Sequence, residues 1–257
     1  MAISMDNDIV PALLEKIKND FSEQTINSQK LKSAFSLLKN RKATYKNVNE
    51  FSIEIGEILA NVLGSNISID IFPDGKMHFN IADRVLNETL KNNYDLISNF
   101  AIDVQEQLNK EAAIKIKGQK PDFNQDRVNG LINKISAAED FDTVKWVLGE
   151  PIVNFSQSVV DDVIKANVDF HAKSGLRPRI NRTLVGHACD WCRKLAGSFD
   201  YYDLPDDIYK RHERCKCIVE YKPGDGRKQN VWSKTWSDPQ REQKIQNRKS
   251  LNLRKDV

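Results

Sequence analysis

Hydrophobic residues recur at spacings of three and four over most of the chain before residue 173, which predicts a mainly helical region. Within residues 8–40, Ile9, Leu13, Ile17 and Phe21 are four positions apart. This spacing places apolar side chains on one face of an α-helix. Further helices are predicted over 50–63, 81–114, 126–138, 142–148 and 152–172.

The hydrophobic period changes from that of a helix to that of a strand over residues 65–79. Ile67, Ile69 and Ile71 alternate with polar residues, and apolar residues alternate again after Pro73-Asp74-Gly75. Alternation on both sides of a turn sequence predicts a β-hairpin.

Alternation returns at 179–184 and at 217–221, after Gly175 and Pro178 have ended the helical region. These two stretches predict strands. We therefore expect an α+β fold with three consecutive parts. The predicted parts are a helical domain with the hairpin (1–174), a cysteine-centred α+β module (175–222) and a basic tail (223–257).

All four cysteines lie inside the predicted module, as the pairs Cys189-x-x-Cys192 and Cys215-x-Cys217. Two short-spaced thiol pairs are typical of a tetrahedral metal site, in which each pair forms a local loop around the same ion. His212 lies three positions before Cys215 and can replace one thiolate, since zinc accepts mixed histidine and cysteine ligands. The sequence therefore predicts a structural zinc site, formed by all four cysteines or by Cys189, Cys192, His212 and either Cys215 or Cys217.

A metal would also explain how so small a module is stable. A module of about 50 residues with few aliphatic side chains buries too little apolar surface to fold alone, and the free energy of metal binding adds to folding. Nearby basic residues would offset the negative charge of a thiolate site. They are Arg193, Lys194, Arg211, Arg214 and Lys216. The alternative is that the thiols stay unligated and pack as small hydrophobic residues.

The start of the chain lacks the basic and then apolar pattern of a signal peptide. We therefore expect synthesis in the cytosol, where thiols stay reduced and a disulfide is disfavoured, although one could form later outside the cell.

The tail is basic, whereas the whole chain has a formal net charge of only +3. Residues 222–257 hold ten Lys or Arg against four Asp or Glu, so the preceding part is net negative. Basic residues with interleaved tryptophans bind phosphates and stack on bases, which predicts contact with DNA or an acidic partner. The alternatives are a solvated charged helix and tryptophans that pack against the module. The candidate residues are Arg227, Lys228, Trp232, Lys234, Trp236, Arg241 and Lys244.

Several other functional classes have no support in the sequence. No apolar run approaches the roughly 20 residues of a membrane helix, so no membrane partner is expected. The sequence contains no Gly-rich phosphate-loop motif, no His-Glu-x-x-His motif and no Gly-x-Ser-x-Gly motif. A hydrolytic metal site using His212 and Glu213 would need an open coordination position, and four thiolates leave none. We therefore expect neither catalysis nor a small-molecule substrate.

Four stretches in the last third of the chain are similar to a known family. They are Phe170–Arg182, Cys189–Gly197, Tyr209–Cys217 and Gly224–Trp232. Their two cysteine pairs, Leu-x-Gly sequence and Arg-His pair resemble the C-terminal part of tailed-phage minor head proteins, the head-morphogenesis proteins of the Mu F-like type. The segment 65–79 has no counterpart in that pattern.

The resemblance implies a structural virion protein of low copy number, made in the host cytoplasm and assembled into the capsid. It implies association with the portal and other inner-head proteins, with packaged DNA as a possible further contact. Some relatives carry a fused ADP-ribosyltransferase, for which a Glu-x-Glu pair would be expected, and this sequence has none. The alternative from the residues alone is a zinc-module protein that binds nucleic acid.

Overall fold

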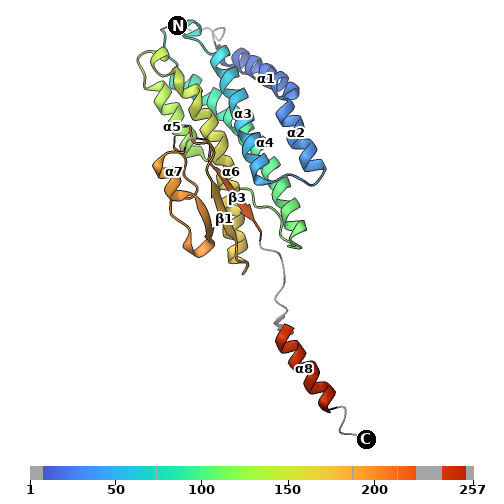
Figure 1. Ribbon diagram of the computed structural model, residues 1–257. Coiled ribbons are helices and arrows are strands. Elements are labelled where there is room, and N and C mark those ends of the chain that lie inside the picture. Colours follow the sequence, from blue (N-terminus) through green and yellow to red (C-terminus); the bar gives the residue numbers. More distant parts are fainter. Residues whose placement is uncertain (1–7, 73, 187, 213, 224–238, 253–257) are drawn as a thin grey trace. The chain divides into compact units, whose positions relative to one another are not determined.

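The structure, a computed structural model, describes residues 8–72, 74–186, 188–212, 214–223 and 239–252 (Figure 1). The chain divides into two compact units, Met1–Asp225 and Gly226–Val257. The first unit combines a helical bundle with a three-stranded antiparallel sheet, which confirms the predicted α+β class. The described part of the second unit is the helix α8 (Pro239–Asn252).

The bundle is organised around one central helix. Its helices are α1 (Val10–Asn27), α2 (Gln29–Lys39), α3 (Tyr45–Asn66), α4 (Phe79–Glu111), α5 (Gln125–Ser136) and α6 (Glu150–Lys173). Figure 1 shows α1 and α2 on one side of α3 and α6 on the other, and α3 packs against all three and against α4. The approach to α6 is close, since a Cβ added at Gly56 would lie 2.9 Å from Val153 Cα. None of the described helices combines the length and the apolar character that crossing a bilayer requires.

Capping side chains set helix boundaries that differ from the predicted ones. The predicted helix over 8–40 is divided at Ser28, whose hydroxyl accepts a backbone N–H of the next turn (3.3 Å) and begins α2. α3 begins directly after Thr44, whose N–H donates to Asn47 Oδ1 (3.0 Å). The predicted end of this helix at residue 63 is three residues early, since α3 continues through Gly64 to Asn66.

The predicted β-hairpin over 65–79 is wrong. In the described residues of this segment, α3 ends, Ile69–Ile71 form a 3-10 helix, and α4 begins at Phe79. The apolar residues of this segment fill the end of the bundle and do not line one face of a sheet. The prediction failed because a short alternating run fits a compact turn as well as a strand. The fully or nearly fully buried ones are Ile67, Phe72 and Met77. Two further 3-10 helices, Phe141–Thr143 and Lys145–Leu148, precede α6.

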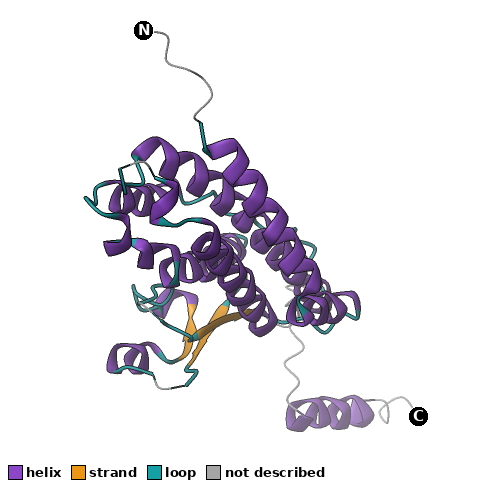
Figure 2. Cartoon of the chain, turned by 90° about the horizontal axis from the view of Figure 1, so that it is seen from above, coloured by secondary structure: helices purple, strands orange, loops and turns teal. Residues whose placement is uncertain are grey.

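The sheet covers one side of the bundle. Its order is β2-β1-β3, with β1 (Arg179–Thr183), β2 (Gly197–Asp200) and β3 (Ile218–Lys222). β1 and β3 confirm the two predicted strands, whereas β2 is short and mostly exposed and so leaves no alternating pattern. β3 packs against α3 and α6, and Figure 2 shows the strands on one side of the helices. The inner face carries Ile180, Arg182, Val219 and Tyr221, each at most 2 % exposed.

The cysteine-containing segment 175–222 belongs to the same compact unit as the bundle. Buried polar contacts join the two: Asn49 Nδ2 of α3 donates to Val219 O (3.4 Å), and His171 Nδ1 of α6 is hydrogen-bonded to the Tyr221 hydroxyl. The position of this segment therefore depends on the bundle as well as on its own core.

Acidification is expected to weaken the contact between α6 and β3. Burial lowers the pKa of His171, whose ring is fully enclosed, below its ordinary value of 6.5. Below pH 6.5 the unfolded chain takes up a proton that the folded chain does not, so stability is full above that pH and falls as the pH drops below it. One proton gives a slope of at most about 1.4 kcal/mol per pH unit.

Urea unfolding at about pH 7.5 and about pH 5.5 measures this effect in the wild type and in His171→Phe. The variant should lose less stability than the wild type when the pH is lowered. Equal losses in the two proteins would assign the acid sensitivity to other groups.

Candidate metal centre

The four cysteines and His212 converge beside the start of β3, as their spacing predicted. They form two overlapping groups, one of Cys189, Cys192 and His212 and the other of Cys192, Cys215 and Cys217. Within each group the ligand atoms lie within 4.8 Å of one another, and Cys192 belongs to both. All four cysteines are free thiols.

Each cysteine pair is presented by its own local structure. Cys189 is the N-cap of the short helix α7 (Asp190–Leu195), and its sulfur accepts a hydrogen bond from Cys192 N (3.4 Å). The second pair follows a turn closed by Cys215 N, which donates to His212 O (3.2 Å), and leads directly into β3. Two local turns on separate elements thus bring the donors together, as in structural zinc sites.

Two of three short donor separations match those of a tetrahedral zinc ion, and the third is shorter. With Zn–S about 2.3 Å and Zn–N about 2.0 Å, tetrahedral geometry places two sulfurs about 3.8 Å apart and a sulfur and a nitrogen about 3.5 Å apart. The sulfurs of Cys192 and Cys215 are 3.7 Å apart. His212 Nε2 lies 3.4 Å from Cys189 Sγ and 3.0 Å from Cys192 Sγ. Five donors are therefore near one another in two groups of three, but neither predicted set of four has all its ligand atoms within 4.8 Å of one another.

The surroundings of the buried donors disfavour free thiolates. Cys192, Cys215 and Cys217 are at most 3 % exposed, whereas Cys189 is exposed. Burial raises the pKa of Cys192 to about 12, so this thiol stays protonated at neutral pH unless a cation compensates the thiolate charge. The backbone N–H of Cys192 lowers the pKa of Cys189.

A cavity of about 360 Å³ opens directly onto the donors. Four of the five donors line it, together with Val185, Gly186, Ala188, Arg214 and Lys216. A metal site needs such an entry path for the ion.

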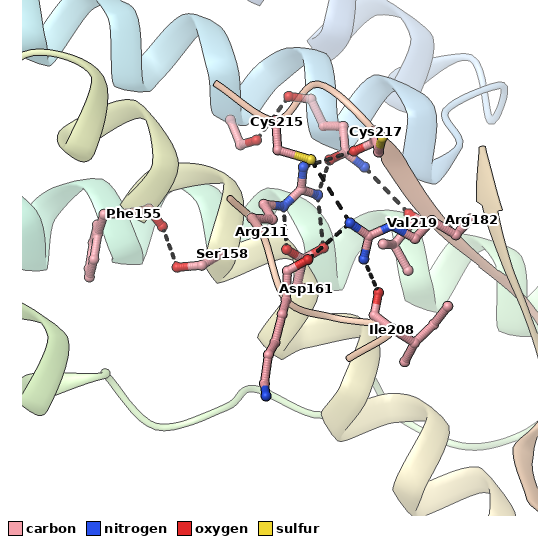
Figure 3. A network of polar contacts seen from close by, with 12 residues as sticks. Phe155, Ser158, Asp161, Arg182, Ile208, Arg211, Cys215, Cys217 and Val219 are labelled. Carbon is pink, nitrogen blue, oxygen red and sulfur yellow. Dashed lines mark hydrogen bonds and ion pairs between the residues drawn. The ribbon is translucent and has the colours of Figure 1, made fainter. Parts of the chain in front are cut away.

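Arg211 ties the ligand loop to the bundle (Figure 3). It forms an ion pair with Asp161 of α6, in which both side chains are 2 % exposed. Nη1 donates to Cys217 O (2.8 Å), and Nη2 donates both to Asp161 Oδ1 (2.8 Å) and to Asn49 Oδ1 of α3 (3.0 Å). Burial alone would lower the pKa of Arg211, but Asp161 outweighs burial and raises it. The charge of Arg211, expected to offset thiolates, is thus matched by a carboxylate.

The sequence did not single out three buried polar residues at the centre, Asn49, Asp161 and Arg182. Two of them left a signal in the pattern. Asp161 interrupts the apolar face of the predicted helix over 152–172. Arg182 lies two positions after Ile180 in a predicted strand, so the side chains of Arg182 and Ile180 share the inner face of that strand. A polar residue at a core position in an otherwise regular pattern is therefore worth examining as a buried contact.

Most of the predicted DNA- or partner-binding residues lie outside the described residues. These are Arg227, Lys228, Trp232, Lys234 and Trp236. Arg241 lies in α8, whose side chains are described only over 243–249, and Lys244 is exposed on that helix. The metal-ligand and tail residues therefore belong to different units.

The donor types indicate the class of ion that the centre accepts. Thiolate and imidazole bind zinc and related soft or borderline metals, whereas calcium and magnesium require oxygen ligands. The cysteine and histidine residues are thus placed to hold a metal ion. No protein-family model, curated protein or solved structure matches the chain.

Proposed function

We propose that this chain is a structural protein of a tailed-phage head, in which zinc fixes the C-terminal part of the first unit. The observation that carries the proposal is the convergence of five soft donors from two short motifs. The stretches that resemble phage minor head proteins supply these donors and also Arg182 and Arg211. The stretches that carry the resemblance thus also contain most of the residues that surround the donors.

Zinc would be held by Cys192, which both donor groups share, and by three of Cys189, His212, Cys215 and Cys217. Four protein ligands fill the tetrahedral coordination of zinc and leave no position for a reactive water. The proposed role is therefore structural and not enzymatic. In this role the protein is made in the host cytoplasm and assembles into the capsid with the portal and other head proteins.

Co-purification with the portal protein of the same phage genome tests the proposal. The wild-type chain should remain bound to the portal, and a Cys215→Ser/Cys217→Ser variant should bind more weakly, because its ligand loop is no longer held. An unrelated capsid protein serves as the control partner. A chain that does not bind the portal, tested with its zinc content verified, would contradict the assignment to the phage head.

A second candidate function is binding of DNA by α8. All described side chains of this helix, residues 243–249, are exposed, and Lys244 and Arg248 are one turn apart on the same face. Ile245 is the only apolar residue in this stretch. A stretch without an apolar face cannot dock by burying hydrophobic surface, so charge is what remains for recognition over residues 243–249.

The salt dependence of binding to duplex DNA tests this candidate. Removing two phosphate contacts with Lys244→Gln/Arg248→Gln should lower the affinity and reduce the slope of log K against log salt by about two. Lys32→Gln/Lys39→Gln removes two exposed lysines from α2 in the first unit and should leave the slope unchanged. The same slope in all three proteins would rule out α8 as the contact.

A further inference from the structure

Arg182 is a buried cation for which the described residues provide no carboxylate at ion-pair distance. Its side chain lies on the inner face of β1, and the residue is 2 % exposed. The carboxylate of Asp207 interacts with the charge of Arg182 from a greater distance, and its ion pair is with Lys210 (2.6 Å). Burying a charge is costly unless an opposite charge compensates it. Arg182 therefore requires a negative group from another source.

The hydrogen bonds of Arg182 direct its charge towards the metal centre (Figure 3). Nη1 donates to the backbone oxygens of Asp207 (3.4 Å) and Ile208, and Nη2 donates to Lys210 O (2.9 Å). Nη2 also lies 3.9 Å from Cys215 Sγ. The buried Nε–H has no acceptor among the described residues. The three carbonyl oxygens hold the guanidinium in place but do not neutralise it.

Arg182 also approaches the other donor group, through Trp191. Its guanidinium carbon lies 5.3 Å from the centre of the Trp191 ring, within cation–π distance. The same ring packs edge-on against His212, with 5.8 Å between ring centres. The side chain of Arg182 thus lies near both donor groups, beside Cys215 of one group and, through Trp191, close to His212 of the other.

We infer that Arg182 is a positioning residue of the metal centre, which holds the Cys215 sulfur towards the ion and compensates the negative charge of the metal–thiolate group. The inference rests on the proposed metal site. Zinc with three or four thiolates carries a net negative charge, which would match the unpaired positive charge of Arg182. Arg211 cannot supply this compensation, because Asp161 already neutralises it.

Cobalt binding to the full chain tests the inference, since Co²⁺ substitutes for zinc and its sulfur-to-metal charge-transfer band reports on the thiolates. Arg182→Met and Arg182→Gln remove the charge, Arg182→Lys keeps it, and Arg179→Met changes an exposed arginine of the same strand. Affinities are measured by competition with a chelator. The neutral variants should bind Co²⁺ about 10–100-fold more weakly, as expected for loss of a partner of a metal ligand.

The band should move to lower energy in the neutral variants, because a thiolate without a nearby cation gives up its electron more easily. Arg182→Lys should stay within a few-fold of the wild-type affinity, and Arg179→Met should match the wild type. Neutral variants that are less stable with and without metal, but have unchanged affinity and band, would show that Arg182 only supports the loop and would overturn the inference. Should Arg182→Met not fold, the comparison of the Gln and Lys variants decides in the same way. A wild type that binds neither Co²⁺ nor Zn²⁺ would instead defeat the proposed metal site itself.

Discussion

Cys192→Ser is expected to abolish specific zinc binding and to destabilise the first unit more than substitution of any other cysteine. Cys192 is 1 % exposed and belongs to both donor groups, so its removal breaks both groups at once. Structural zinc contributes roughly 10–16 kcal/mol of binding free energy in small zinc peptides at neutral pH. A domain's entire stability is about 5–15 kcal/mol, so loss of even part of this contribution should unfold segment 175–222. Elemental analysis and urea unfolding measure both effects.

Cys189→Ser is the matched comparison for this prediction. Cys189 is exposed and belongs to one donor group only, and its removal leaves the group of Cys192, Cys215 and Cys217 complete. This variant should keep zinc with reduced affinity. In the presence of a strong chelator the wild type and both variants should approach the same stability, since the metal contribution is gone from all three. A full equivalent of zinc in Cys192→Ser, or a wild type whose stability the chelator does not change, would contradict the predicted centre.

Arg211→Met is expected to lower the free energy of unfolding by about 3–5 kcal/mol. The substitution leaves the Asp161 carboxylate buried without its counter-charge, and it removes the hydrogen bonds to Cys217 O and Asn49 Oδ1. Urea unfolding of the zinc-loaded protein measures the loss. Because the arginine joins the ligand loop to α3 and α6, the variant should also release zinc faster to a chelator.

Two further variants separate the effect of leaving a charge buried without its partner from the general effect of losing an arginine. Asp161→Asn/Arg211→Met removes both charges and should recover part of the stability lost in the single variant. Arg179→Met breaks an exposed ion pair with Asp200 and should change stability by at most about 1 kcal/mol. A loss in Arg211→Met no larger than that in Arg179→Met would mean that the buried pair contributes little.

The sequence predicted those features that depend on residues close together in the chain. Helical spacing identified the main helices of the bundle, and alternation identified β1 and β3. The convergence of the five donors was also predictable, because each cysteine pair is spaced to form its own turn. Where local signals were ambiguous, the prediction failed: the alternating isoleucines before Phe72 form a compact 3-10 turn and not a hairpin.

The contacts that place the metal centre on the bundle could not be predicted in this way. Arg211 meets Asp161 from 50 positions away and Asn49 from 162 positions away. No periodic pattern encodes a pairing between single residues so far apart. The charge of Arg211 was visible in the sequence, but its burial and its carboxylate partner depend on how β3 packs against α3 and α6.

The separation of 162 positions between Asn49 and Arg211 also fixes an order of events during synthesis. α3 and α6 leave the ribosome before the loop that covers their polar groups, and contacts this distant in the chain form late in folding. Until the loop with Arg211 is in place, the side chains of Asn49 and Asp161 face water on the surface of the helical bundle. If the centre holds zinc as proposed, zinc supply would act on the last stage of maturation of the newly made chain, after the helices have assembled.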